Sequence, residues 1–291
     1  METRLVEVTD QRVVEVAQWG AAGGPVVVFH SGTPTGLVPF DPLLRSASER
    51  GVRVVTVLRP GYGRSTPSPG RTVADVAADI GAVASSLAID SYVAIGHSGG
   101  GPHALACREL DAPRCRAAIT VAGVGPYGAE GLDFLDGMGE DNVEEFGAAL
   151  AGEPALTDFL SAFAGAIFDI QPDGVIEAIG SLLPEVDRRY LLDGLADYLA
   201  AALRTGVANG IDGWRDDDLA FVRRWGFETA RLTNVSIWQG IDDLMVPFAH
   251  GRYLAGVIPG STPHLLEGEG HLSVLAGQID AIVDEALAYL R

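Results

Sequence analysis

The stretch from Tyr92 to Pro102 constrains this chain of 291 residues more than any other. Its apolar and β-branched residues are typical of a buried strand, and Gly96-His-Ser98-Gly-Gly100 follows with the spacing G-x-S-x-G. The next residues, 102–110, are compatible with a helix. A strand, a tight glycine-containing turn and a helix are the context in which this motif forms a nucleophile elbow. We therefore expect Ser98 at the carboxyl edge of a sheet.

Apolar runs of strand length alternate with amphipathic helical patterns before residue 126 and after residue 228. Residues 5–8 and 12–19 alternate like two half-buried strands. Continuous apolar runs, expected of fully buried strands, lie at residues 26–29, 52–58, 93–95, 117–122 and 235–238, and residues 73–87 have helical spacing. This pattern predicts an α/β fold with a mainly parallel sheet covered by helices on both faces.

Between residues 126 and 228 the strand-like runs stop and helical periodicity takes over. Leu156, Leu160 and Ile167, for example, fall on one face of a helix. We interpret residues 126–228 as a helical cap inserted between two strands, with residues 1–125 and 229–291 forming the core domain.

The charge of the chain excludes several functions. The net charge is −19, and all 20 basic residues are arginine. Without lysine, neither a P-loop nor a lysine Schiff base is available. Residues 126–228 hold 21 acidic residues against six arginines, a net charge of −15, so nucleic acid and anionic membranes are not expected partners. The apolar runs are too short for a membrane span, and the acidic N-terminus does not resemble a signal peptide, which together predict a cytoplasmic location.

A serine hydroxyl attacks efficiently only when a base takes its proton and an acid orients that base. In chains with this elbow the order is serine, then aspartate or glutamate, then histidine. The turn after the strand at 235–240 contains Asp242 and Asp243, and both are candidates for the acid. His271, in a glycine-bounded loop before the last helix, is the expected base. The other histidines are interpreted as packing or supporting residues: His30, His97, His103, His250 and His264.

Backbone N–H donors are needed where negative charge develops on the carbonyl oxygen under attack. Gly99, immediately after the nucleophile, is expected to supply one donor. The loop of residues 30–34 is expected to supply the other, with Thr33 as the first choice and Gly32 as the alternative. No histidine and carboxylate residues have the pattern of a metal site, and Cys107 and Cys115 lack zinc-site spacing, so we expect neither a metal nor a cofactor.

Together, these motifs resemble the α/β-hydrolase superfamily over nearly the whole chain. The matching segments, in order, are residues 30–34, 59–65, 96–100, 240–247 and 268–271. The resemblance implies an eight-stranded sheet with the cap after the sixth strand, and it assigns the acid to the fourth residue from Gly240, which is Asp243. Ser31 stands where many members have the histidine of a His-Gly pair, so Gly32 stays beside Thr33 as a candidate. Serine at the elbow argues against haloalkane dehalogenases and epoxide hydrolases, which use aspartate there.

The expected function is a cofactor-free serine hydrolase that cleaves a small, mostly uncharged ester, thioester or lactone through an acyl-enzyme on Ser98. An alternative is a proline iminopeptidase-like enzyme or a carbon–carbon bond hydrolase. A cap glutamate cluster that binds a free amino terminus would favour the peptidase, and Glu144-Glu145 is the candidate. A binding protein without turnover is a third hypothesis, which an intact serine, acid and base disfavour.

Overall fold

A computed structural model describes residues 2–291. Its central sheet has eight strands in the order β1-β2-β4-β3-β5-β6-β7-β8. The strands are β1 (Glu2–Glu7), β2 (Val13–Gly20), β3 (Val26–His30), β4 (Arg53–Val57), β5 (Tyr92–His97), β6 (Cys115–Val121), β7 (Val235–Gly240) and β8 (Thr262–Leu266). Strand β2 runs antiparallel to β1 and β4, and all other neighbours are parallel. The prediction of a mainly parallel eight-stranded sheet is confirmed.

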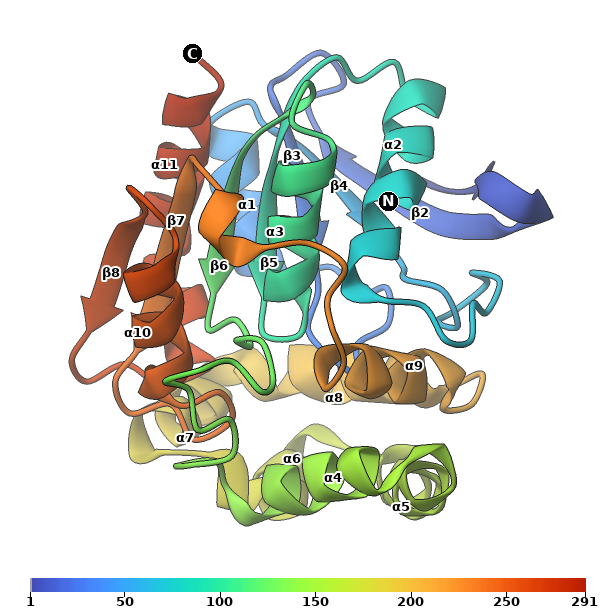
Figure 1. Cartoon of the computed structure of the whole chain (residues 1–291), viewed down its shortest axis with the longest axis vertical. Coiled ribbons are helices and arrows are strands. Elements are labelled where there is room, and N and C mark those ends of the chain that lie inside the picture. Colours follow the sequence, from blue (N-terminus) through green and yellow to red (C-terminus); the bar gives the residue numbers. More distant parts are fainter. Residues whose placement is uncertain (1) are drawn as a thin grey trace.

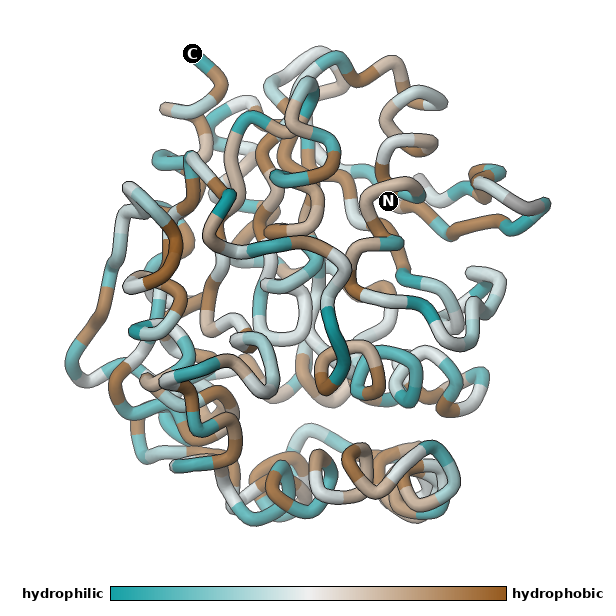
Figure 2. Tube along the Cα trace, in the orientation of Figure 1, coloured by the Kyte–Doolittle hydropathy of each residue, from teal (hydrophilic) through white to brown (hydrophobic). Residues whose placement is uncertain are grey.

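Helices cover both faces of this sheet (Figure 1). One face packs against α1 (Asp41–Glu49) and α11 (Ser273–Tyr289), and the other against α2 (Val76–Ser86), α3 (Gly100–Leu110) and α10 (Phe248–Val257). Successive side chains of a strand point to opposite faces, so Val27 of β3 joins one core cluster and Val28 the other. Because both faces are buried there, the inner strands β3, β5 and β6 are apolar at most positions, and Figure 2 colours the chain by this hydropathy.

The segment between β6 and β7 is helical, and the described residues there contain no strand. Its helices are α4 (Glu140–Ala151), α5 (Glu153–Ile167), α6 (Val175–Ala178), α7 (Glu185–Tyr190), α8 (Ala196–Val207) and α9 (Asp212–Phe221). We call these the insertion helices; they lie beyond the carboxyl ends of the parallel strands (Figure 1). Leu156, Leu160 and Ile167 are fully buried in a third core cluster, which reaches Leu58 and Leu272 outside the insertion.

The division of the chain into a core domain and a cap stays a prediction. None of the described helices has both the length and the apolar character that crossing a membrane requires.

Candidate active site

Ser98 occupies the turn between β5 and α3 in a conformation that side chains rarely adopt. Its φ is +55°, and the turn is fixed by bonds from Ser98 N–H to Val121 C=O and from Gly101 N–H to Ser98 C=O, both 2.9 Å long. A Cβ atom on Gly96 would lie 2.2 Å from the carbonyl oxygen of Gly100. Such crowding explains the glycine at this position of the motif, and strained non-glycine residues cluster at functional sites.

The histidine expected as base contacts one of the two competing aspartates. The Nδ1 atom of His271 lies 2.9 Å from Oδ2 of Asp243. The other oxygen, Oδ1, accepts the N–H groups of Met245 and Val246, each at 2.9 Å, which fixes the carboxylate. Asp242 is exposed, and of the carboxylates in the part of the chain that the structure describes, only Asp243 bonds to the ring. The structure thus brings Asp243, and not Asp242, to His271.

The electrostatics of this pair suit a base. Burial disfavours the charged imidazolium, but the Asp243 carboxylate outweighs burial and raises the pKa of His271 above its ordinary value. His97, whose ring centroid is 4.8 Å from that of His271, behaves differently: burial lowers its pKa to about 3. Neutral His97 therefore supports the loop, donating from Nε2 to the carbonyl oxygen of His271 at 3.1 Å.

The remaining histidines lie in supporting positions. His250 accepts the N–H of Gly125 at Nδ1 and donates from Nε2 to the Phe134 carbonyl, at 3.0 and 2.9 Å. His264 stacks on Trp238 at 3.9 Å. His30 and His103 are buried on the β3 and α3 sides of the elbow.

The expected oxyanion donors lie side by side. A Cβ atom on Gly99 would lie 2.5 Å from Oγ1 of Thr33, and one on Gly32 would lie 3.2 Å from Cβ of Ser98. Among residues 2–291, no acceptor takes the backbone N–H of Gly32, Thr33 or Gly99. All three residues line the same cavity as Ser98, so these donors are free for a ligand oxygen, and the choice between Thr33 and Gly32 stays open.

A buried ion cluster, which the sequence reasoning missed, supports the loop of residues 30–34. Asp217 of α9 is fully buried and binds Arg59 at 2.6 Å and Arg71 at 2.7 Å. Its Oδ2 atom also accepts the Thr33 hydroxyl at 2.8 Å, while Arg59 donates to the Ser31 carbonyl at 2.7 Å. Burial alone would raise the pKa of Asp217, but the two guanidinium groups hold it well below its ordinary value. The aspartate therefore remains charged and ties the loop to α9.

A second missed aspartate supports the loop of the histidine. Asp187 of α7 is fully buried. Its carboxylate accepts three backbone N–H groups: those of His271 at 2.8 Å, Leu272 at 3.1 Å and Ser273 at 2.8 Å. A Cβ atom on Gly270 would lie 2.6 Å from this carboxylate. Asp187 therefore caps the N-terminus of α11 and fixes the backbone from which His271 projects.

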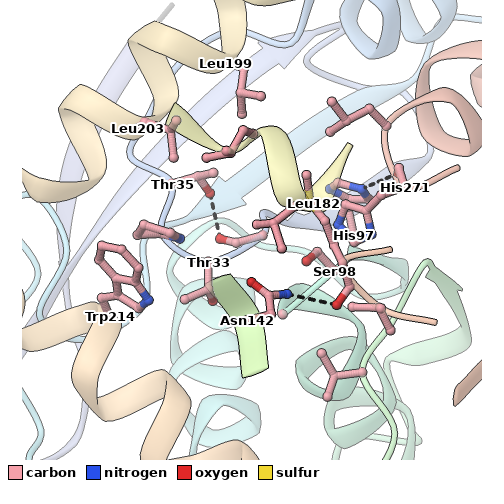
Figure 3. Close-up of a pocket in the computed structure, with 18 of the residues that line it drawn as sticks. Thr33, Thr35, His97, Ser98, Asn142, Leu182, Leu199, Leu203, Trp214 and His271 are labelled. Carbon is pink, nitrogen blue, oxygen red and sulfur yellow. Dashed lines mark hydrogen bonds between the residues drawn. The ribbon is translucent and has the colours of Figure 1, made fainter. Parts of the chain in front are cut away.

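Ser98, His271 and the expected oxyanion donors line one cavity of about 140 Å³ between the sheet edge and the insertion helices, and Asp243 lies outside it. Figure 3 shows Ser98, His97 and His271 on one side of it and Trp214 on the other, with Thr33 between them. The remaining wall is largely apolar but includes three acidic side chains, Asp141, Glu145 and Asp218. Within residues 2–291, no group of three or more histidine, cysteine, aspartate or glutamate side chains is placed to hold a metal ion.

Comparisons with known proteins agree with this fold. A family model described as alpha/beta hydrolase fold matches residues 25–278. A non-heme chloroperoxidase of Streptomyces lividans is 34% identical over 289 residues, 98% of this chain and 99% of that protein. A bifunctional esterase/perhydrolase of Acinetobacter calcoaceticus is 37% identical over 84 residues, 28% of this chain and 30% of that protein. The solved structure of an esterase from Exiguobacterium antarcticum has a TM-score of 0.70 at 20% identity, covering 98% of this chain and 100% of that chain. The resemblance of the motifs is thereby confirmed: the chain is an enzyme of the alpha/beta hydrolase fold family.

Proposed function

We propose that the enzyme is a serine hydrolase that cleaves a small ester, thioester or lactone through an acyl-enzyme on Ser98. Asp243 accepts the Nδ1 proton of His271, so Nε2 is the basic nitrogen. Nε2 removes the proton from Ser98 as its Oγ attacks the substrate's carbonyl carbon. The carbonyl π electrons move onto oxygen, where the N–H groups of Gly99 and of Thr33 or Gly32 stabilise the charge.

The tetrahedral intermediate then collapses. The bond to the alcohol or thiol breaks, and the leaving group takes the proton from Nε2 of His271. Water repeats the sequence on the acyl-enzyme: His271 takes its proton, hydroxide attacks, and Ser98 leaves with the proton returned. Nothing in this cycle requires a redox partner, and every proton passes through one imidazole.

One observation carries the proposal: the strained Ser98, the Asp243-bonded His271 and three residues whose backbone N–H groups have no acceptor among residues 2–291 line one cavity. A hydrolase needs each of these parts, whereas a binding protein needs none of them together. The name of the Acinetobacter relative, an esterase/perhydrolase, supports the same reaction class.

The test is the variant Ser98→Ala, assayed with p-nitrophenyl esters and labelled with a fluorophosphonate. We expect kcat to fall by about 10³-fold or more and labelling to disappear. Ser48→Ala, at an exposed serine of α1, is the matched control and should keep both. Full residual turnover in Ser98→Ala would refute the proposal.

A second acceptor for the acyl group is suggested by the same relative's name, which includes perhydrolase. Hydrogen peroxide in place of water would attack the acyl-enzyme, give a peracid and release Ser98 with its proton. The experiment adds peroxide to a hydrolysing mixture and measures peracid. Peracid formation that persists in Ser98→Ala would show that it does not pass through the acyl-enzyme.

A further inference from the structure

Two of the three acidic side chains in the cavity wall form a pair that joins two insertion helices. Glu145 lies on α4 and Asp218 on α9, and both line the cavity that Ser98 lines. Of the two glutamates that the sequence offers for an amino group, Glu144 is exposed and Glu145 lines the cavity. Trp214 lies next to this pair, because its Nε1 donates a hydrogen bond to Oε1 of Glu145 at 2.7 Å. In Figure 3, Trp214 lies across the cavity from His271.

Across the described residues, arginine side chains do not balance the negative charge of Glu145 and Asp218, whereas they do balance the charge of the other buried aspartates of α9. Asp217 binds two arginines, and Asp216 lies 3.3 Å from Arg215. In the described part of the chain, no arginine or histidine forms an ion pair with Glu145 or Asp218. The guanidinium of Arg71 acts on Asp218 only from a distance, since it is bound to Asp217.

Asp218 also has a buried oxygen without a hydrogen-bond donor. The side chain is 1% exposed, and no N–H or hydroxyl of residues 2–291 reaches its Oδ2 atom. Burial and the neighbouring Glu145 raise the pKa of Asp218 well above its usual value, and burial raises that of Glu145. The donor that Oδ2 lacks is supplied within the pair: two close carboxyl groups in such surroundings share a proton, and Glu145 and Asp218 are hydrogen-bonded to each other. The pair then keeps one negative charge with no arginine or histidine ion-pair partner among residues 2–291, and a cationic ligand would stabilise that charge.

The chemistry of the wall indicates the ligand. A primary ammonium group carries three N–H donors and the charge opposite to that of the carboxylates. Most of the other side chains that line the cavity are apolar, and they include Phe146, Phe163 and Leu203. They suit a hydrocarbon spacer between the ammonium group and the ester carbonyl, whereas an anionic substituent would be repelled.

We propose that Glu145 and Asp218 form a subsite for a protonated amino group of the substrate. Substrates are then small amine-bearing esters, thioesters or lactones, with the reacting carbonyl at Ser98 and the ammonium group at the carboxyl pair. The inference rests on the proposed function for the reaction, and it narrows the mostly uncharged substrate expected from the sequence.

The first test measures binding and does not depend on turnover. Primary alkylammonium ions of three to eight carbons, and the 1-alkanols and alkanoates of the same lengths, are titrated calorimetrically into the wild-type protein and into Glu145→Gln and Asp218→Asn. We expect at least one ammonium ion to bind about tenfold or more tightly than its alkanol, and each substitution to remove this preference. Glu144→Gln, one residue away and exposed, is the control and should retain it.

The second test measures turnover with p-nitrophenyl 6-aminohexanoate and p-nitrophenyl heptanoate, which differ by an ammonium against a methyl group. The kcat/KM ratio of amine to alkyl ester should fall in Glu145→Gln and Asp218→Asn, while heptanoate is still hydrolysed. Equal binding of ammonium and alkanol by the wild type, or a preference that survives both substitutions, overturns the subsite. Ammonium binding without any ester turnover overturns the hydrolase instead, so the two failures are distinguishable.

Discussion

Replacing Asp187 with asparagine tests whether the insertion helices position the base. The carboxylate accepts the N–H groups of His271 at 2.8 Å, Leu272 at 3.1 Å and Ser273 at 2.8 Å. Asparagine has the same shape but only one acceptor oxygen, and its NH₂ group faces at least one of these donors. A buried donor without an acceptor costs about 1–3 kcal/mol, and bonds to a charged group are the stronger ones. We therefore expect the free energy of unfolding to fall by about 2–4 kcal/mol.

The substitution should also move the pH profile. Burial lowers the pKa of His271, whereas Asp243 and, to a smaller extent, Asp187 raise it; the neighbouring His97 stays neutral. Only neutral His271 can take the serine proton, so kcat/KM rises as pH rises through its pKa. Removing the negative charge of Asp187 destabilises the imidazolium. The acidic limb of kcat/KM should therefore shift to lower pH, while the plateau falls because the ring is less well placed.

Urea denaturation measures the first effect, and p-nitrophenyl ester hydrolysis across pH measures the second. Asp193→Asn is the matched control, because this aspartate is exposed in the π-helical segment Leu191–Leu195 after α7, and it should change neither. An Asp187→Asn protein with wild-type stability and a wild-type pH profile would refute the reasoning. If Asp187→Asn is destabilised but its pH profile of kcat/KM does not move, Asp187 has a structural role only.

Three further outcomes are expected. Asp243→Asn should lose roughly 10³–10⁴-fold in kcat while Asp242→Asn stays near wild type, and the reverse order would reassign the acid. Asp217→Asn should lose about 3–5 kcal/mol of unfolding free energy, because Arg59 and Arg71 then lack a buried counter-charge; urea midpoints measure this, and an unchanged midpoint would contradict it. Chelators should leave ester hydrolysis unchanged in a timed assay, whereas inhibition reversed by added metal would contradict the mechanism.

Local signals were sufficient to predict much of the fold. Part of the steric demand of the turn at Ser98 is local, because Gly96 faces Gly100 four residues later, and a short motif contains it. Gly99 and Gly100 instead face Thr33 and the carbonyl oxygen of His30, which lie far away in the sequence. Strand positions followed from the burial of both sheet faces, which leaves continuous apolar runs. The contact between Asp243 and His271 joins residues only 28 positions apart, at the ends of adjacent elements.

The acidic residues of the insertion could not be interpreted in the same way. Acidic residues such as Asp216, Asp217 and Asp218 are ordinarily found exposed to solvent, yet all three are buried. Their burial depends on partners far along the chain: Arg59 lies 158 positions from Asp217. Amphipathic periodicity assumes that charge faces water, and it fails where a helix is covered on its polar side by arginines and by a ligand cavity. The acidity of the insertion therefore has a structural role that a net charge does not reveal.

Asp217 and Asp187 connect the insertion helices to two loops of the candidate site. Asp217 of α9 binds the loop that carries Thr33, 184 positions away, and Asp187 of α7 binds the loop that carries His271, 84 positions away. Moving α7 or α9 away from the sheet edge would break buried charged contacts and displace an oxyanion donor or the base. An opening motion that leaves the geometry of the candidate site intact must therefore keep α7 and α9 in place.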